Sequence, residues 1–187
     1  MKRLTAAALL VCLPLAPVAA EDLDARVQDA KGVMMGFMKE LKGELKSAMK
    51  EGGPVNAIQV CNKVAPGIAK KQSEASGWNV GRTSLKYRNP DNAPDAWERA
   101  VLNRFEERKA AGESPKQLMH AEVVEQDGQE RVRVMKAIPT GKVCLNCHGT
   151  DIDPKVEAKL DELYPEDMAR GFKQGDIRGA FTLSQPM

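Results

Sequence analysis

The feature that most constrains this chain is the five-residue run Cys144-Leu145-Asn146-Cys147-His148. Two thiols at this spacing, followed by a histidine, are typical of c-type haem attachment, in which each thiol forms a thioether with a haem vinyl group. The adjacent histidine then lies under the iron and serves as its proximal ligand. We therefore expect one covalent haem c, held in a loop or pocket by Cys144 and Cys147, with His148 on the iron.

Two other kinds of site can use a Cys-x-x-Cys pair. A zinc site would recruit Cys61 and a histidine to complete a Cys₃His set. A thioredoxin-like redox centre needs the pair at the start of a helix that follows a strand. Here the pair follows Pro139 and Gly141 and precedes Gly149, which is typical of a loop. The histidine after the second cysteine is required only for haem attachment, so the pattern favours haem.

The N-terminus has the features of a secretory signal. Two basic residues are followed by an apolar stretch (residues 4–15) and by Val18-Ala19-Ala20, a small-residue cleavage site. This divides the chain into a signal peptide (1–20) and one domain (21–187). The apolar stretch is too short to span a bilayer comfortably, and no later segment reaches the length that a span requires. We expect a soluble protein exported to the periplasm, where bacteria attach c-type haem.

The charge balance excludes some partners. The predicted signal carries two of the 28 basic residues and none of the 26 acidic residues, so 26 of each remain in the domain. Such a domain has no broad electrostatic attraction for nucleic acid or anionic lipid. We expect a redox or signalling partner whose identity the sequence does not reveal.

The cysteine count raises the question of a second iron ligand. Without Cys12, which lies in the predicted signal, the chain has three cysteines, an odd number for an exported protein. If two of them bind haem, Cys61 has no disulfide partner. The candidates for the sixth ligand are Cys61, His120 (the only other histidine) and several methionines. The residues alone leave these alternatives open.

The apolar periodicity predicts an α+β domain. Amphipathic helices are expected at 23–49 and 55–75, separated by Gly52-Gly53-Pro54, and Pro66 predicts a kink or break just after Cys61. The near-heptad spacing of the first helix is also compatible with a homodimer. The other expected elements are a strand at 77–85, a helix at 94–111, a hairpin of strands 121–125 and 131–138 joined through Asp127-Gly128, a helix at 154–163 and a strand at 176–184.

Several further runs carry a resemblance to a known family. They are Val60-Cys61 with Ala65-Pro66, Gly77-Trp78 with Val80-Gly81-Arg82-Thr83-Ser84, Arg88-Asn89-Pro90, Asn92-Ala93-Pro94-Asp95 with Trp97-Glu98, His120-Ala121-Glu122-Val123-Val124, Tyr164-Pro165 and Gly175-Asp176-Ile177-Arg178-Gly179-Ala180. With the Cys-x-x-Cys-His run, they make the chain similar, over about residues 25–185, to a c-type haem family. That family was first met as a cyanobacterial haem protein of unknown function, and it also occurs as a sensor domain of some histidine kinases.

The resemblance implies a PAS-like fold, with an antiparallel sheet, a long N-terminal helix and flanking helices. It also implies one covalent haem whose axial ligands are the motif histidine, His148, and a cysteine. Cys61 matches the position of that ligand cysteine. Arg82 and Arg178 are our candidates for contacts with the haem propionates, because arginine pairs with carboxylates through two parallel hydrogen bonds.

Two functions follow as hypotheses. The first is an exported monohaem c-type cytochrome with His/Cys ligation, acting in electron transfer or in redox or gas sensing, whose ferrous form can bind a small gas. The alternative is a haem enzyme, a peroxidase or a gas-converting protein, with His120 as the distal acid–base residue. Because a six-coordinate iron leaves no free position for a substrate, the sequence favours the first function over an enzyme.

Overall fold

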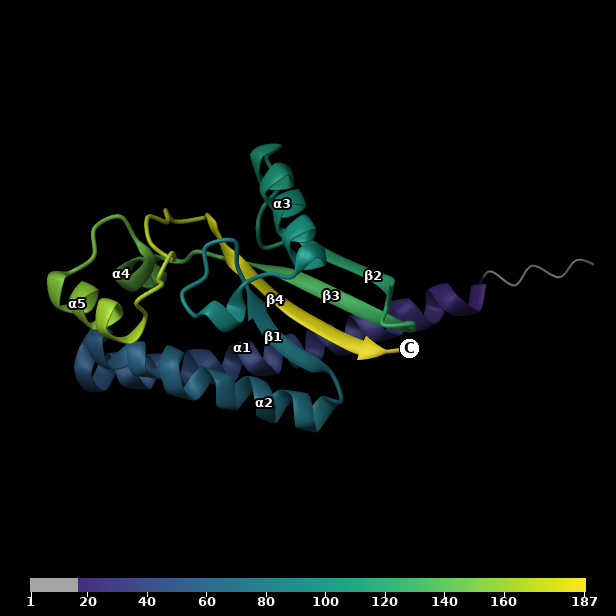
Figure 1. Ribbon diagram of the computed structural model, residues 1–187, viewed down its shortest axis with the longest axis horizontal. Helices are drawn as coiled ribbons and strands as arrows, with labels where there is room; N and C mark the ends of the chain where they lie inside the picture. Colours follow the sequence, from purple (N-terminus) through teal and green to yellow (C-terminus); the bar gives the residue numbers. More distant parts are fainter. Residues whose placement is uncertain (1–16) are drawn as a thin grey trace, which may run out of the picture.

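The computed structural model describes residues 17–187 and confirms the expected α+β class (Figure 1). A four-stranded antiparallel sheet has the order β1-β4-β3-β2. Helices α1 and α2 run side by side along one face of this sheet, and α3 lies on the other. Most of the predicted signal, residues 1–16, lies outside the described residues. Within residues 17–187, no helix combines the length and the apolar character that crossing a membrane requires.

The first helix, α1 (Pro17–Gln59), is interrupted where the sequence predicts an end. Gly52 and Gly53 leave the helical conformation, and Gly53 has a φ of 68°, in the left-handed region that glycine adopts without a Cβ clash. The second helical stretch starts again at Pro54. The predicted separation into two helices is therefore confirmed, although α1 begins at Pro17 rather than at residue 23.

The predicted irregularity near Cys61 is a π-helical turn, Val60–Val64, between α1 and α2 (Ala65–Ser76). Pro66 has no N–H to continue the α-helical hydrogen-bond pattern, and its ring clashes with the preceding turn. The backbone widens instead, so that the Ala65 N–H donates to the carbonyl of Val60, five residues earlier. Turns of this kind often occur at functional sites, and this one carries Cys61.

The strands confirm the hairpin and the order of elements. The sheet consists of β1 (Asn79–Thr83), β2 (Met119–Gln126), β3 (Gln129–Pro139) and β4 (Ile177–Pro186). Asp127 and Gly128 connect β2 to β3 with φ values of 55° and 74°. Two successive positive φ values are what a tight type I′ hairpin turn requires, which explains the Asp-Gly pair.

Alternate side chains of the sheet form two apolar layers. On one face, residues such as Val134 and Leu183 pack with Met34 and Phe37 of α1, and all four are at most 2% exposed. Burying one such side chain contributes about 1.5–3 kcal/mol. The apolar stripe of α1 is thus covered by the chain's own sheet, and the homodimer through this helix stays a prediction.

On the opposite face, α3 (Ala96–Ala110) covers the sheet with Val101, Leu102 and Phe105. The helix begins with a capping box, in which the Asp95 carboxylate accepts a hydrogen bond from the Glu98 N–H at 2.8 Å and the Glu98 carboxylate accepts one from the Asp95 N–H at 3.1 Å. The helix therefore starts after Asp95 and not at residue 94 as expected.

The Cys-x-x-Cys-His run lies at the end of the sheet beside the second half of α1, where Cys147 packs in one apolar cluster with Val55 and Ile58 (Figure 1). The expected loop is wrong here, because the run forms a 3₁₀ turn, Lys142–Cys144, followed by one helical turn, α4 (Leu145–His148). Gly149 allows α4 to end tightly, since an added Cβ would lie 2.6 Å from the carbonyl oxygen of Leu145. Helix α5 (Pro154–Leu163) then packs against the second half of α1.

Candidate functional site

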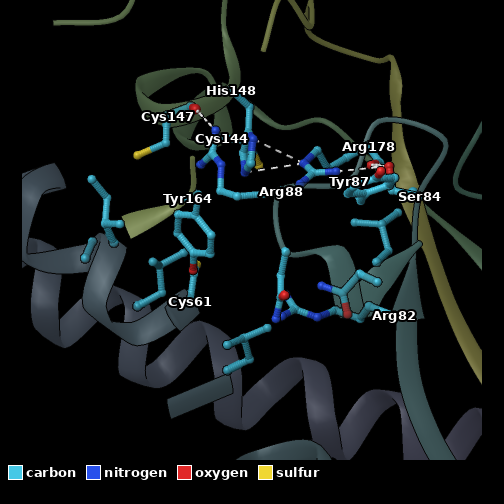
Figure 2. A pocket seen from close by; sticks show the side chains of 18 of the residues that line it. Cys61, Arg82, Ser84, Tyr87, Arg88, Cys144, Cys147, His148, Tyr164 and Arg178 are labelled. Atoms are coloured by element: carbon cyan, nitrogen blue, oxygen red, sulfur yellow. Dashed lines mark hydrogen bonds between the residues drawn. The ribbon is translucent and has the colours of Figure 1, made fainter. Parts of the chain in front are cut away.

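A cavity of about 210 Å³ lies between α1, the π-helical turn, β1 and the Cys-x-x-Cys-His run (Figure 2). Its walls include apolar side chains of α1, among them Leu41, Leu45 and Ile58. A mostly apolar cavity with a few polar groups is typical of cofactor sites. Six of the seven predicted site residues line it, namely Cys61, Arg82, Cys144, Cys147, His148 and Arg178.

The cysteines and the histidine occupy two sides of this cavity. Figure 2 shows Cys144, Cys147 and His148 together on one side, and Cys61 beside Tyr164 on the other. The first group comes from the turns after β3, and Cys61 comes from the π-helical turn that Pro66 induces. A group held between these sides would meet an imidazole from one direction and a thiol from the other.

The hydrogen bonds of His148 determine which ring nitrogen carries the proton. Its Nδ1 lies 2.8 Å from the carbonyl oxygen of Ala169. A carbonyl can only accept, so Nδ1 carries the proton and Nε2 has the lone pair. This lone pair faces the Nε–H of Arg178 at 3.3 Å. Nε2 is the atom that would bind a metal, and Arg178 Nε gives up this contact when it does. Burial, with the positive charges of Arg178 and Arg88, lowers the pKa of His148 well below its ordinary value. The imidazole is therefore neutral, the form in which histidine coordinates metals.

Arg82 and Arg178 are cations without an anionic partner. Arg178 donates from Nη1 to Ser84 Oγ at 3.2 Å, and Arg82 lies over the ring of Phe37 at 5.6 Å. Neither forms an ion pair with a carboxylate of residues 17–187. Burial lowers the pKa of Arg82, and burial together with neighbouring arginines lowers the pKa of Arg178 to about 10. Two desolvated guanidinium groups at one cavity suit a ligand that carries two carboxylates.

His120, the predicted alternative to Cys61, does not line this cavity. Met119 and Ala121 face the α1 layer, so His120 between them points to the α3 side of the sheet. There its ring lies 5.9 Å from that of Trp97, centroid to centroid, and its Nε2 lies 3.6 Å from the Glu122 carboxylate. Its predicted alternative roles, as distal ligand or as distal acid–base residue, have no geometric basis in this arrangement.

The zinc alternative does not find support either. In the part of the chain that the structure describes, no three His, Cys, Asp or Glu side chains come close enough to hold one metal ion. Cys61, Cys144 and Cys147 are free thiols. Burial, the largest influence on Cys147, raises the pKa of its thiol.

A buried ion pair between Arg88 and Asp167 lies beside the site, and the sequence did not predict it. Arg88 Nε donates to Asp167 Oδ1 at 3.0 Å, and the two side chains are only 8% and 2% exposed. The Nη2 group of Arg88 also donates to the backbone carbonyls of Cys147 and Ala169. Arg88 belongs to one of the runs that carry the family resemblance, but no local pattern marks Asp167, which lies 79 residues further along the chain.

Comparison with known proteins matches most of the chain. A model of the Tll0287-like family, described as Tll0287, matches residues 20–186. The crystal structure of the cyanobacterial heme-protein Tll0287 is similar, with 25% sequence identity and a TM-score of 0.63 over 89% of this chain and 96% of that one. No curated protein matches. Because the family match extends from the start of the predicted domain to its last strand, the chain belongs to the Tll0287-like family.

Proposed function

We propose that this protein is a c-type haem protein. One haem is joined to Cys144 and Cys147 by thioethers, and His148 is the proximal ligand of its iron. The observation that carries the proposal is that the Cys-x-x-Cys-His run forms one wall of an apolar cavity. Two arginines that have no carboxylate partner within residues 17–187 also line it. The solved relative, by its title a heme-protein, supports the same cofactor.

Arg82 and Arg178 determine which edge of the haem faces them in this proposal. Arg82 and Arg178 pair with the two propionates, which removes the cost of holding desolvated cations without an anion. Charge-assisted hydrogen bonds of this kind contribute about 1.5–3 kcal/mol each. The vinyl edge then lies at Cys144 and Cys147, because propionate and vinyl groups occupy different edges of haem.

Cys61 is the sixth ligand in this proposal. It lies across the cavity from His148 in Figure 2, and the described chain offers it no disulfide partner. Haem supplies one-electron redox chemistry when bound. A thiolate donates strongly to iron, stabilises the ferric state and gives a lower reduction potential than a methionine ligand.

A six-coordinate site of this kind serves electron transfer, or sensing of redox state or of a small gas, rather than substrate turnover. Gas binding requires that Cys61 leave the ferrous iron, which protonation of its sulfur favours. The domain has a PAS-like arrangement, is exported to the periplasm by residues 1–20, and acts on a redox or signalling partner.

The test of the cofactor is expression of the chain together with a c-type haem maturation system. The expected product is red, and its haem resists acid–acetone extraction. The matched control, with Cys144→Ala and Cys147→Ala, loses its haem in the same extraction. A colourless wild-type protein from cells that load a control cytochrome would overturn the proposal.

The test of the sixth ligand is optical and electron paramagnetic resonance (EPR) spectroscopy of the ferric protein. Cys61→Ser removes the low-spin thiolate signature, whereas His120→Ala leaves the spectrum unchanged, because His120 contacts Trp97 and Glu122 instead of the cavity. An unchanged Cys61→Ser spectrum, or a changed His120→Ala spectrum, would contradict the assignment.

A further inference from the structure

We propose that Arg88 and Asp167 are positioning residues that fix the orientation and the Nδ1 hydrogen bond of His148, and through them the electronic state of the iron. The inference rests on the proposed haem site. It concerns how the chain holds one ligand, and it assigns a role to the most deeply buried ion pair of the described residues.

Asp167 shapes the turn that presents the hydrogen-bond acceptor for His148. Its Oδ1 accepts the N–H of Ala169 at 2.8 Å as well as the Nε–H of Arg88 at 3.0 Å. Its Oδ2 accepts the Nε–H of Arg170 at 2.9 Å. Three donors therefore hold one buried carboxylate, and the carbonyl of Ala169 has a fixed position two residues along the chain.

Arg88 connects this turn to the haem-attachment helix. Its Nη2 donates to the carbonyl of Cys147, next to His148, and at 3.2 Å to the carbonyl of Ala169. That second carbonyl is also the acceptor of His148 Nδ1, at 2.8 Å. One guanidinium thus sets the distance between the backbone that carries the ligand and the oxygen that orients it.

Backbone hydrogen bonds complete the frame on the other side of the turn. The Phe172 N–H donates to the carbonyl of His148 at 2.9 Å, and the Gly171 N–H donates to the carbonyl of Gly149 at 2.9 Å. The edge of the His148 ring also meets the Phe172 ring, with centroids 6.2 Å apart. With these contacts fixed, Arg88 and Asp167 are the side chains that determine where Ala169 O lies relative to the imidazole.

The chemical consequence is a tuned ligand. A hydrogen bond from Nδ1 to an acceptor fixes the tautomer and the ring orientation and raises the basicity of the Nε2 lone pair. A better donor stabilises ferric iron, so a weakened Nδ1 hydrogen bond should raise the reduction potential. An ion pair that only held two segments together would change the stability of the protein without changing the iron.

The test is Arg88→Lys in the haem-loaded protein. Lysine keeps the positive charge, but a single ammonium group cannot reproduce the planar fork that bonds Asp167 and two carbonyls at once. We expect a shift in the ferric EPR g values, an upfield shift of the His148 Nδ1 proton in NMR spectra and a higher midpoint potential, with the haem still covalently attached. The matched control is Arg108→Lys, which alters a half-exposed pair with Glu113 (2.7 Å) and should change none of these.

Two outcomes would overturn the inference. The first is an Arg88→Lys protein that unfolds at a lower temperature but keeps the wild-type g values, proton shift and potential. If Arg88→Lys does not fold, the same measurements are made on Asp167→Asn. The second outcome is then an Asp167→Asn protein with the g values, proton shift and midpoint potential of the wild type. A wild-type protein without covalent haem would instead refute the proposed function.

Discussion

Replacing Asp167 by asparagine tests how much the buried carboxylate contributes to the fold. The side chain is 2% exposed and accepts hydrogen bonds from Arg88, Arg170 and the Ala169 N–H. Removing one partner of a buried ion pair costs about 3–5 kcal/mol, because the other charge stays buried. Arg170 also pairs with carboxylates of α5, so we expect the lower end, about 3 kcal/mol at pH 7. For a domain of this size, that corresponds to a fall in Tm of roughly 6–12 °C.

The pH dependence of this difference has a defined sign. Burial raises the pKa of Asp167, but the hydrogen bonds from Arg88 and Arg170 outweigh it, so the folded-state pKa lies below the ordinary 3.8. A carboxyl group with a lowered folded-state pKa contributes stability above its unfolded pKa and loses it as the pH falls through the folded pKa. The gap between wild type and Asp167→Asn should therefore be full at pH 7 and at pH 5, and shrink below about pH 4.

Urea unfolding of the haem-loaded proteins, followed by circular dichroism at pH 7, 5 and 3, measures this gap. The matched control is Asp161→Asn, which removes another partner of Arg170 whose side chain is 63% exposed. An exposed pair is worth about 0–1 kcal/mol, so this variant should resemble the wild type. Equal stability of Asp167→Asn and wild type at pH 7, or a gap of unchanged size at pH 3, would refute the reasoning.

Three other substitutions test the frame of the site by urea unfolding. Asp95→Ala removes the capping box of α3 and an ion-pair partner of Arg133, and should cost about 1–2 kcal/mol. Gly179→Ala places a Cβ 2.4 Å from the carbonyl oxygen of Thr83, at a φ of 153°, and should cost about 2 kcal/mol or more; a cost near zero would contradict the close approach of β1 and β4. Leu160→Ala empties a fully buried position in α5 and should cost about 2–5 kcal/mol, whereas an unchanged midpoint would mean that the packing of α5 on α1 contributes little.

Local signals in the sequence predicted most of the elements. The helix expected at 154–163 is α5 with the same bounds, and the Asp127-Gly128 pair forms the hairpin turn, because both signals depend on residues close in the chain. Pro66 predicted an irregular helix for the same reason. The prediction of a loop at the Cys-x-x-Cys-His run is wrong, since flanking glycine and proline residues also suit two short helical turns.

The site was harder to predict wherever it depends on long-range packing. Strand alternation is readable in the sequence around His120, but which face of the sheet adjoins the cavity is not, and His120 lies on the α3 side. The pair of Arg88 and Asp167 joins residues 79 apart with no repeating pattern between them. The Cys-x-x-Cys-His run, in contrast, could be found from the sequence, because its residues are close together in the chain. The spacing of the two thiols is the one that attachment to the two vinyl groups of one haem requires.

Three arginines line the cavity, and their carboxylate partners distinguish the proposed positioning residue, Arg88, from the proposed propionate ligands, Arg82 and Arg178. Arg82, Arg88 and Arg178 are the charged side chains among the lining residues, and within the described residues only Arg88 has a carboxylate partner, Asp167. The local sum of these four groups is therefore two positive charges. In a poorly solvated cavity such an excess is costly unless a ligand neutralises it. A ligand with two carboxylates balances the site, a monoanion leaves one cation uncompensated, and a cation adds to the excess, so the charges of the cavity favour the dicarboxylate haem that we propose.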